Sequence, residues 1–119
     1  MATMAESLGF TLLGGVFVWA GAEHFWNFRK VTGYLTEKGF PAAAILLGLG
    51  SIVEIIAGLC LAIGVMRAYA ATALILFTIA ATLMALNFWR YSGAERQGLR
   101  SAFIINFAVV GGLILAATA

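Results

Sequence analysis

The chain has 119 residues, of which 63% are hydrophobic and only 10% are charged, with a formal net charge of +2. This composition excludes an ordinary soluble globular domain and is typical of an integral membrane protein. The single cysteine, Cys60, excludes an internal disulfide and a two-cysteine redox relay. The single histidine, His24, excludes a haem held by two histidines and a histidine-rich metal site within the chain.

Four segments are apolar over about the 20 residues that a helix needs to cross roughly 30 Å of hydrocarbon. They cover residues 8–28, 41–66, 69–89 and 99–117. Because little chain remains outside them, we predict a single domain over residues 1–119, an all-α transmembrane four-helix bundle with up-down-up-down topology. No cleavable signal peptide is expected, since the residues before the first segment include an acidic residue and no basic one.

The connections between these segments contain residues that break helices. Residues 29–40 form the longest polar stretch, in which Gly39 suits a positive φ. Pro41 suits the first turn of a helix, so the second helix is predicted to begin there. Only residues 66–68 separate the second and third segments, so their helices are predicted to be antiparallel neighbours. Residues 91–98 are predicted to form the last loop.

The basic residues are divided unevenly between the two sides of the predicted bundle. Six of the seven flank the first and third connections, and one lies at the second. Under the positive-inside rule, loops 29–40 and 90–98 are cytoplasmic and both termini lie outside. We therefore expect these cations to set the orientation of the chain in the lipid membrane, and we expect no nucleic-acid partner. They are Arg29, Lys30, Lys38, Arg90, Arg96 and Arg100 on one side and Arg67 on the other.

Glu54 lies near the middle of the second segment. An ionisable group there costs roughly 2.5–3.5 kcal/mol on insertion scales, so it usually faces protein or a wet cavity and marks a functional site. Its helical neighbours three and four residues away are all small, so this face can press against another helix. The alternative is a carboxyl group that only hydrogen-bonds between helices. The small neighbours are Gly50, Ser51, Ala57 and Gly58.

Further polar residues are predicted to share the cytoplasmic half of the membrane with Glu54. His24, with an ordinary pKa of about 6.5, suits proton exchange between a buried acid and water, or simple anchoring at the interface. Glu23 is expected to pair with an arginine of the loops. Asn87 and Asn106 are expected either to hydrogen-bond between helices or to join His24 and Glu54 in one polar pocket.

Aromatic and small residues supply two further patterns. Aromatic residues gather on the predicted cytoplasmic side, which is typical of an interfacial belt. The alternative is that Phe17, Phe88 and Trp89 line a site for a flat lipid-soluble molecule. Small residues at helix-packing spacing, such as Gly14 and Gly21, indicate close contacts between helices.

Several short motifs are spread over nearly the whole chain. They are AGAEHF at residues 20–25, KGFP at 38–41, Glu54 with Gly58 and Gly64, and NFW at 87–89. In these motifs the chain resembles the DoxX family of small four-helix membrane proteins. Glu54 matches the acidic position of the family's second helix, and His24 matches the polar position after the Ala-Gly pair. The chain departs from the family pattern at Asn87, where members commonly carry a histidine. Asparagine cannot titrate, so it cannot take part in proton exchange at that position.

The resemblance carries implications for location and partners. Named relatives include the small subunit of a thiosulfate:quinone oxidoreductase and a membrane component that organises redox enzymes. The resemblance therefore implies a bacterial or archaeal cytoplasmic (inner) membrane protein close to the quinone pool, working with a partner. We expect either a larger protein complex or a homo-oligomer.

Three functions follow from these observations. The preferred one is a subunit that anchors or assembles a larger membrane redox complex, with quinone or lipid contact as an additional role. The second is a quinone-handling oxidoreductase subunit with proton exchange through Glu54 and His24. The third, an oligomeric small transporter, is weaker because one acidic residue per subunit is sparse for selectivity. The candidate ligand-binding residues are Phe17, Glu23, His24, Glu54, Asn87, Phe88, Trp89 and Asn106.

The electron source is the part that the chain does not supply. A quinone site needs apolar walls and protonatable groups at the quinone oxygens. No flavin, haem or iron–sulfur motif is present, so we expect no cofactor and no metal within the chain, and electrons would come from a partner.

Overall fold

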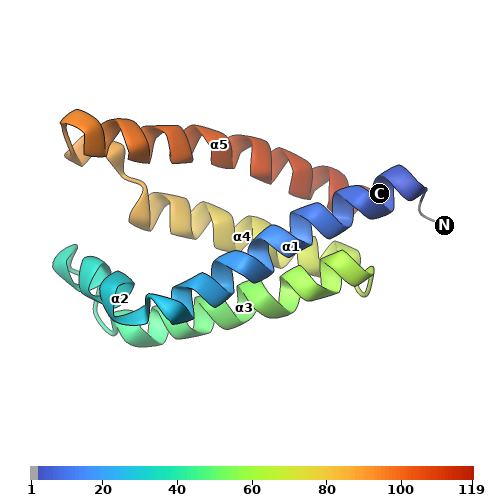
Figure 1. Cartoon of the computed structure of the whole chain (residues 1–119), viewed down its shortest axis with the longest axis horizontal. Helices are drawn as coiled ribbons and strands as arrows, with labels where there is room; N and C mark the ends of the chain where they lie inside the picture. Colours follow the sequence, from blue (N-terminus) through green and yellow to red (C-terminus); the bar gives the residue numbers. More distant parts are fainter. Residues whose placement is uncertain (1–2) are drawn as a thin grey trace.

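The computed structural model describes residues 3–119, and every element assigned in this range is a helix (Figure 1). Four helical segments are long and apolar enough to cross a membrane. The longest extent of the molecule is 46 Å, close to the roughly 40–45 Å of a bilayer with its headgroups. The predicted all-α class, with four helices that could span a membrane, is confirmed. The elements are α1 (Met4–Trp26), α2 (Phe28–Glu37), α3 (Ala43–Ile63), α4 (Arg67–Ala85), the 3₁₀ turn η1 (Phe88–Arg90) and α5 (Gly93–Thr118).

The long helices form two pairs, with α1 packed along α3 and α5 packed along α4 (Figure 1). The start of α1 and the end of α5 lie at one end of the molecule together with the turn between α3 and α4 (Figure 1). The short helix α2 and the connection between α4 and α5 lie at the other end, which we call the α2 end (Figure 1). All basic residues except Arg67 belong to the elements and connections at the α2 end.

Helix α1 begins before the apolar segment does. The Thr3 hydroxyl accepts a hydrogen bond from the Glu6 backbone N–H at 3.0 Å, and the Glu6 carboxylate accepts one from the Thr3 N–H at 3.0 Å. This capping box satisfies two backbone donors that a helix start leaves unpaired, so the helix extends back to Met4.

The first connection is not the open polar loop that was expected, because α2 forms within it. Val31, Tyr34 and Leu35 lie three and four residues apart, so they share one face of a helix. Leu35 is buried in a small cluster with Ala43 and Leu47 of α3, against which Val31 and Tyr34 also pack. A helix this short depends on such tertiary packing, and the many charges of the segment concealed its apolar face.

The prediction that the second long helix begins at Pro41 is wrong, because α3 begins at Ala43. Gly39 has φ 92° and Ala42 has φ 52°, so the chain turns twice through left-handed conformations around Pro41. The Ala42 carbonyl accepts the first helical hydrogen bonds, from the N–H groups of Ile45 and Leu46 at 3.0 Å. The predicted positive φ at Gly39 is confirmed.

The third long helix is also shorter than its apolar segment. Helix α4 ends at Ala85, whose carbonyl accepts a hydrogen bond from the Tyr34 hydroxyl at 2.9 Å. Asn87 therefore precedes η1, outside the regular helix. At the following connection, α5 begins at Gly93, so Gly98 lies inside a helix and not in the predicted loop 91–98.

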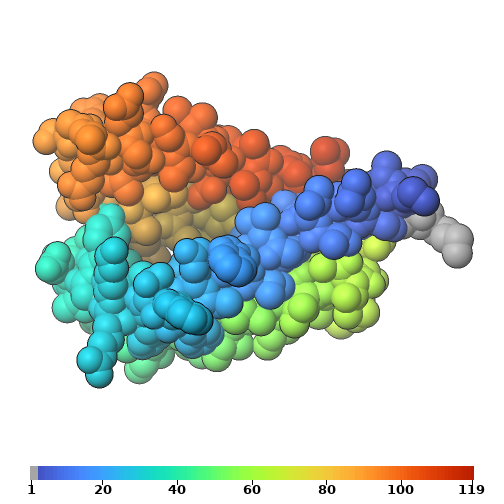
Figure 2. Space-filling view, in the orientation of Figure 1, coloured from blue at the N-terminus to red at the C-terminus, as the bar shows by residue number. Residues whose placement is uncertain are grey.

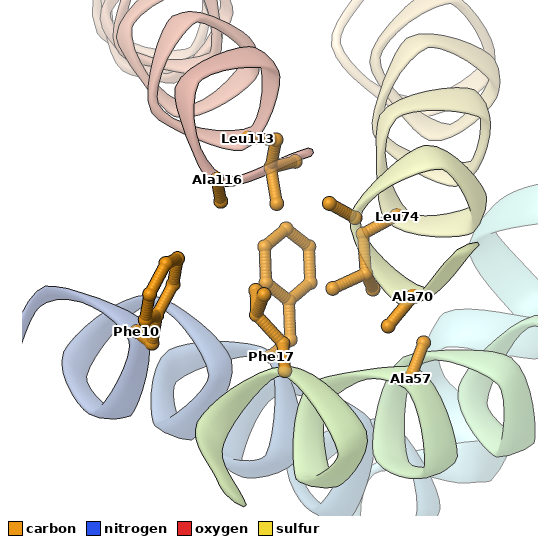
Figure 3. Packing of buried hydrophobic residues seen from close by; sticks show 9 residues of the cluster. Phe10, Phe17, Ala57, Ala70, Leu74, Leu113 and Ala116 are labelled. Atoms are coloured by element: carbon orange, nitrogen blue, oxygen red, sulfur yellow. The ribbon is translucent and has the colours of Figure 1, made fainter. Parts of the chain in front are cut away.

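The main core lies between the four long helices, toward the end where α1 starts and α5 ends. Leu61, Ala71, Leu74 and Leu113 are completely buried there. Figure 3 shows side chains of α1, α3, α4 and α5 meeting in this core, with the Phe17 ring pointing between Leu74 and Leu113. Toward the α2 end the pairs separate, and α4 is visible at the bottom of the gap between α5 and α1 (Figure 2). Helix α5 is the least buried of the four spans.

Candidate functional site

Glu54 and His24 are in direct contact between α3 and α1. His24 Nδ1 lies 2.8 Å from Glu54 Oε1, and the Glu54 side chain is only 3% exposed whereas that of His24 is 32% exposed. A hydrogen on Nδ1 would not be aligned with Oε1, so the two atoms are at ion-pair distance without forming an aligned hydrogen bond. The carboxyl group is thus enclosed by protein, whereas the side chain of its histidine partner is partly exposed.

Glycines on α1 create the space in which Glu54 lies. A Cβ added to Gly21 would come within 3.0 Å of the Ser51 carbonyl and 3.3 Å of the Glu54 Cβ. Two turns earlier, a Cβ on Gly14 would come within 2.4 Å of the Gly58 carbonyl. Small residues let helices approach closely in a membrane. The close approach of α1 to α3 therefore brings His24, one turn beyond Gly21, onto the carboxylate.

An apolar pocket of about 270 Å³ adjoins this pair at the α2 end. Helices α2 and α4 form its sides, α3 lies between them, and α1 contributes His24. The Phe77 ring forms part of the wall and lies against Gly50. The pocket residues are His24, Val31, Tyr34, Leu35, Leu46, Leu47, Gly50, Ser51, Phe77, Ala80, Ala81, Met84 and Ala85.

This arrangement supports proton exchange next to an apolar ligand. The pair can hold one proton either on the imidazole, facing a carboxylate, or on the carboxyl group, facing a neutral imidazole. Both forms have the same total charge, so the proton can move between the two groups without a net charge entering the bilayer interior. Among residues 3–119, no group of three or more His, Cys, Asp or Glu side chains is arranged to hold a metal ion.

Two other predicted site residues lie away from the pocket. Phe17 is 7% exposed and belongs to the main core, where it packs against Gly58 and the inner faces of α4 and α5 (Figure 3). Glu23 is exposed, and no ion pair joins it to an arginine within residues 3–119, contrary to expectation. Glu23 directly precedes His24 on α1, but its side chain is exposed.

The two asparagines do not join the His24–Glu54 pair either. The Asn106 amide donates a hydrogen bond to the Thr82 hydroxyl at 2.8 Å, between α5 and α4, beside a separate cavity of about 180 Å³. Asn87 accepts a hydrogen bond from the Lys38 ammonium at the α2 end. Of the two alternatives left open for the asparagines, the hydrogen bond between helices is found for Asn106, and neither residue lines the pocket beside His24.

Phe88 and Trp89 form an aromatic cluster with α5 and do not line the pocket. The rings of Phe88 and Trp89 lie 5.3 and 6.0 Å from that of Phe103, with edge-to-face geometry. Phe103 in turn contacts Phe107 at 5.6 Å. These contacts fasten η1 to α5 and agree better with an interfacial position than with a ligand wall.

Sequence reasoning overlooked several pocket residues, among them Ser51, Tyr34 and Phe77. Tyr34 could have been found from the three- and four-residue spacing of apolar side chains in residues 28–35. Phe77 had no distinguishing signal, because phenylalanine is ordinary in an apolar span. Ser51 was noted only as a small neighbour of Glu54.

A family model described as DoxX matches residues 11–87. The chain belongs to the DoxX family. No curated protein and no solved structure was found to match it. The matched region covers residues 11–26 of α1 and the whole of α2, α3 and α4, and contains every residue that lines the pocket. The DoxX match therefore includes the His24–Glu54 pair, whereas η1 and α5 lie beyond it.

A second polar cluster in this DoxX protein closes the α2 end. The Lys38 ammonium lies 4.8 Å from the ring centroids of both Tyr34 and Tyr91, and it donates a hydrogen bond to Asn87. The hydroxyl oxygens of Tyr91 and Tyr34 are 3.5 Å apart. The cluster ties α2 to the connection between α4 and α5, so it fixes the distance between the two sides of the pocket.

The two tyrosines of this cluster are expected to titrate far apart. The nearby Lys38 ammonium, helped by the Tyr34 hydroxyl, lowers the pKa of Tyr91. Burial, and then the contact with Tyr91, raise the pKa of Tyr34. As the pH rises, Tyr91 should therefore lose its proton first. Ultraviolet titration of tyrosinate should show an early step that disappears in Tyr91→Phe and moves to higher pH in Lys38→Gln, while an unchanged early step in Lys38→Gln would contradict this assignment.

Proposed function

We propose that this DoxX-family chain is a small membrane subunit of a larger redox complex, which it helps to anchor, and that it handles quinone in the pocket beside His24. The contact between His24 and the enclosed Glu54 at the edge of an apolar pocket is the observation that carries this proposal. An ionisable group inside a membrane protein is costly and is usually retained for function.

The pocket has the chemical properties that a quinone ring requires. Its walls are mainly aliphatic and aromatic, and its few polar groups converge from α1, α2 and α3. Ligand pockets commonly measure about 300–1,000 Å³, so a pocket of about 270 Å³ suits a single ring, with an isoprenoid tail left among the lipids. A multi-ring ligand would fit less well.

His24 and Glu54 have different roles in this proposal. Reduction of a quinone takes up two protons with two electrons, and a redox-active partner protein supplies the electrons. His24 lines the pocket and exchanges a proton with the ring oxygen, whereas Glu54 does not line it and acts through His24. Glu54 is thus a positioning residue that stabilises the protonated imidazole and holds a proton in reserve.

The membrane placement of the chain forms part of the proposal. The excess of Lys and Arg at the α2 end supports a cytoplasmic position for that end, with both termini outside, after four crossings of a prokaryotic cytoplasmic membrane. Helix α5 supports the anchoring role, because it contacts α1 only near the chain ends and leaves apolar side chains such as Ile105 and Phe107 exposed. Lipid or a partner helix can cover this face.

The test is Glu54→Gln in the complex purified from its native membrane with its co-purifying partners. Direct general acid–base groups contribute about 10²–10⁴-fold to rates, and Glu54 acts through another residue, so turnover with a short-chain quinone should fall about tenfold or more. Glu95→Gln, which changes an exposed carboxylate on α5, is the matched control and should leave turnover unchanged.

Native mass spectrometry of the same preparations separates anchoring from proton exchange. An assembled Glu54→Gln complex with reduced turnover supports the quinone role. Normal turnover in Glu54→Gln would reject proton exchange through this residue and leave the anchoring role. Recovery of the chain without any protein partner, in mild detergent, would reject the anchoring role.

A further inference from the structure

Ser51 carries a buried hydroxyl group without a hydrogen-bond partner. It is 0% exposed, its Oγ has no partner within the described residues, and it lines the pocket beside His24. Nearly all buried polar groups in proteins are paired. An unpaired hydroxyl at the wall of a cavity therefore needs a physical reason.

A serine or threonine hydroxyl in a helix can hydrogen-bond to a backbone carbonyl of the same helix, and several threonines of this chain do so. Thr11, Thr36 and Thr72 each donate a hydrogen bond to the carbonyl four residues earlier, at 2.9, 2.8 and 2.7 Å. Ser51 makes no such bond to its own helix. Its hydroxyl is consequently free to bond a group inside the pocket.

The position of Ser51 relates it directly to the proton-exchanging pair. Ser51 and Glu54 are three residues apart, so they lie on the same face of α3, one turn from each other. The backbone of Ser51 faces Gly21 of α1, and His24 follows one turn later on the same face of α1. Ser51 of α3 and His24 of α1 therefore both line a pocket whose walls are otherwise mainly apolar.

We propose that Ser51 Oγ hydrogen-bonds a ring oxygen of the ligand and makes the pocket selective for oxygen-bearing rings over hydrocarbons of the same shape. This inference rests on the proposed function and specifies how the site recognises its substrate. A hydroxyl group both donates and accepts, so Ser51 bonds the carbonyl of a quinone and equally the hydroxyl of the quinol. His24, from the facing helix, exchanges the proton at that oxygen.

Selectivity follows from the cost of an unpaired polar group. A site built to hydrogen-bond a ligand oxygen discriminates strongly against an analogue that lacks it, because the polar group of the site then stays buried and unpaired. The Phe77 ring, which lies against Gly50 next to Ser51, restricts the ligand to a flat shape at this end. Shape and hydrogen bonding therefore select together for a planar ring with an oxygen substituent.

The experiment compares a benzoquinone bearing a decyl tail with decylbenzene, each titrated against the purified full chain by native mass spectrometry. Ser51→Ala should weaken quinone binding about tenfold, as expected for one hydrogen bond, and leave decylbenzene binding unchanged. Thr78→Ala is the matched control, because Thr78 is also a buried hydroxyl without a partner but does not line the pocket. It should bind both ligands as the unaltered chain does.

Infrared spectroscopy of the bound quinone gives a second readout that a purely structural role would not move. In the unaltered chain one carbonyl stretch should lie at lower frequency than in micelles, and Ser51→Ala should shift it back. Equal quinone affinity and an unchanged carbonyl band in Ser51→Ala would overturn the role of Ser51 while leaving the proposed function intact. Equal weakening by Thr78→Ala would also overturn it. Absence of quinone binding by the unaltered chain would reject both proposals.

Discussion

Gly14→Ala is expected to lower the free energy of unfolding by about 1–3 kcal/mol, the usual cost of inserting a methyl group into a tightly packed interior. The added Cβ would lie 2.4 Å from the Gly58 carbonyl oxygen and 2.7 Å from the Ala62 backbone nitrogen. Backbone atoms cannot move aside as a flexible side chain can. The helices α1 and α3 must therefore separate, which reduces the packing that holds the bundle together.

Gly15→Ala is the matched control for this prediction. Gly15 is the next residue on the same helix, and its added Cβ would meet nothing within 4 Å. Because alanine is favoured over glycine within a helix by up to about 1 kcal/mol, Gly15→Ala should leave stability unchanged or slightly raised. Circular dichroism during titration with sodium dodecyl sulfate measures both variants in the same mixed micelles. Equal effects of the two substitutions would show that α1 and α3 are not in backbone contact at Gly14.

The long helices and their small faces were predictable because they depend on local features of the chain. Apolar length alone identifies the spans, and the regular spacing of Gly14 and Gly21 indicates a helix contact. It does not identify the opposing residues. That Gly14 meets Gly58 while Gly15 meets nothing is set by the rotation of α1 about its axis, and rotation depends on the other helices.

The connections were harder to predict, because tertiary contacts overrule their local composition. The charged residues of α2 indicated a loop, whereas packing of Leu35 against Ala43 and Leu47 makes the segment helical. Pro41 is acceptable in the first turn of a helix, yet the turn through Ala42 delays the start of α3. Composition gave no sign of either outcome, and the only available signal for α2 was the helical spacing of Val31, Tyr34 and Leu35.

Part of the candidate site was predictable from chemistry. Glu54, in the middle of an apolar helix, was expected to contact a polar side chain of another helix, and His24 is the one histidine in the chain. The partners of Asn87 and Asn106 were not predictable, since an asparagine bonds to whichever polar group packing brings near. Ser51 gave no signal because most helical hydroxyls bond to their own backbone.

His24→Leu is expected to destabilise the protein by about 3–5 kcal/mol, the usual cost of removing one partner of a buried ion pair. Glu54 is 2% exposed, so its carboxylate has no route to water once the imidazole is lost. Glu54→Leu should cost less, because the remaining His24 is partly exposed and can release its proton. The two single substitutions are therefore expected to be unequal, although they remove the same contact.

The double variant His24→Leu/Glu54→Leu tests the physical reason for this asymmetry. It removes both charges and fills the space with apolar side chains, a replacement that is often neutral or stabilising for buried pairs. It should therefore be more stable than His24→Leu alone in the same detergent titration, even though it carries one more substitution. Additive losses in the double variant would show that the two side chains are not energetically coupled. A large coupling would mean that Glu54 is kept in the membrane interior by its contact with His24, which is the condition on which proton exchange beside the pocket depends.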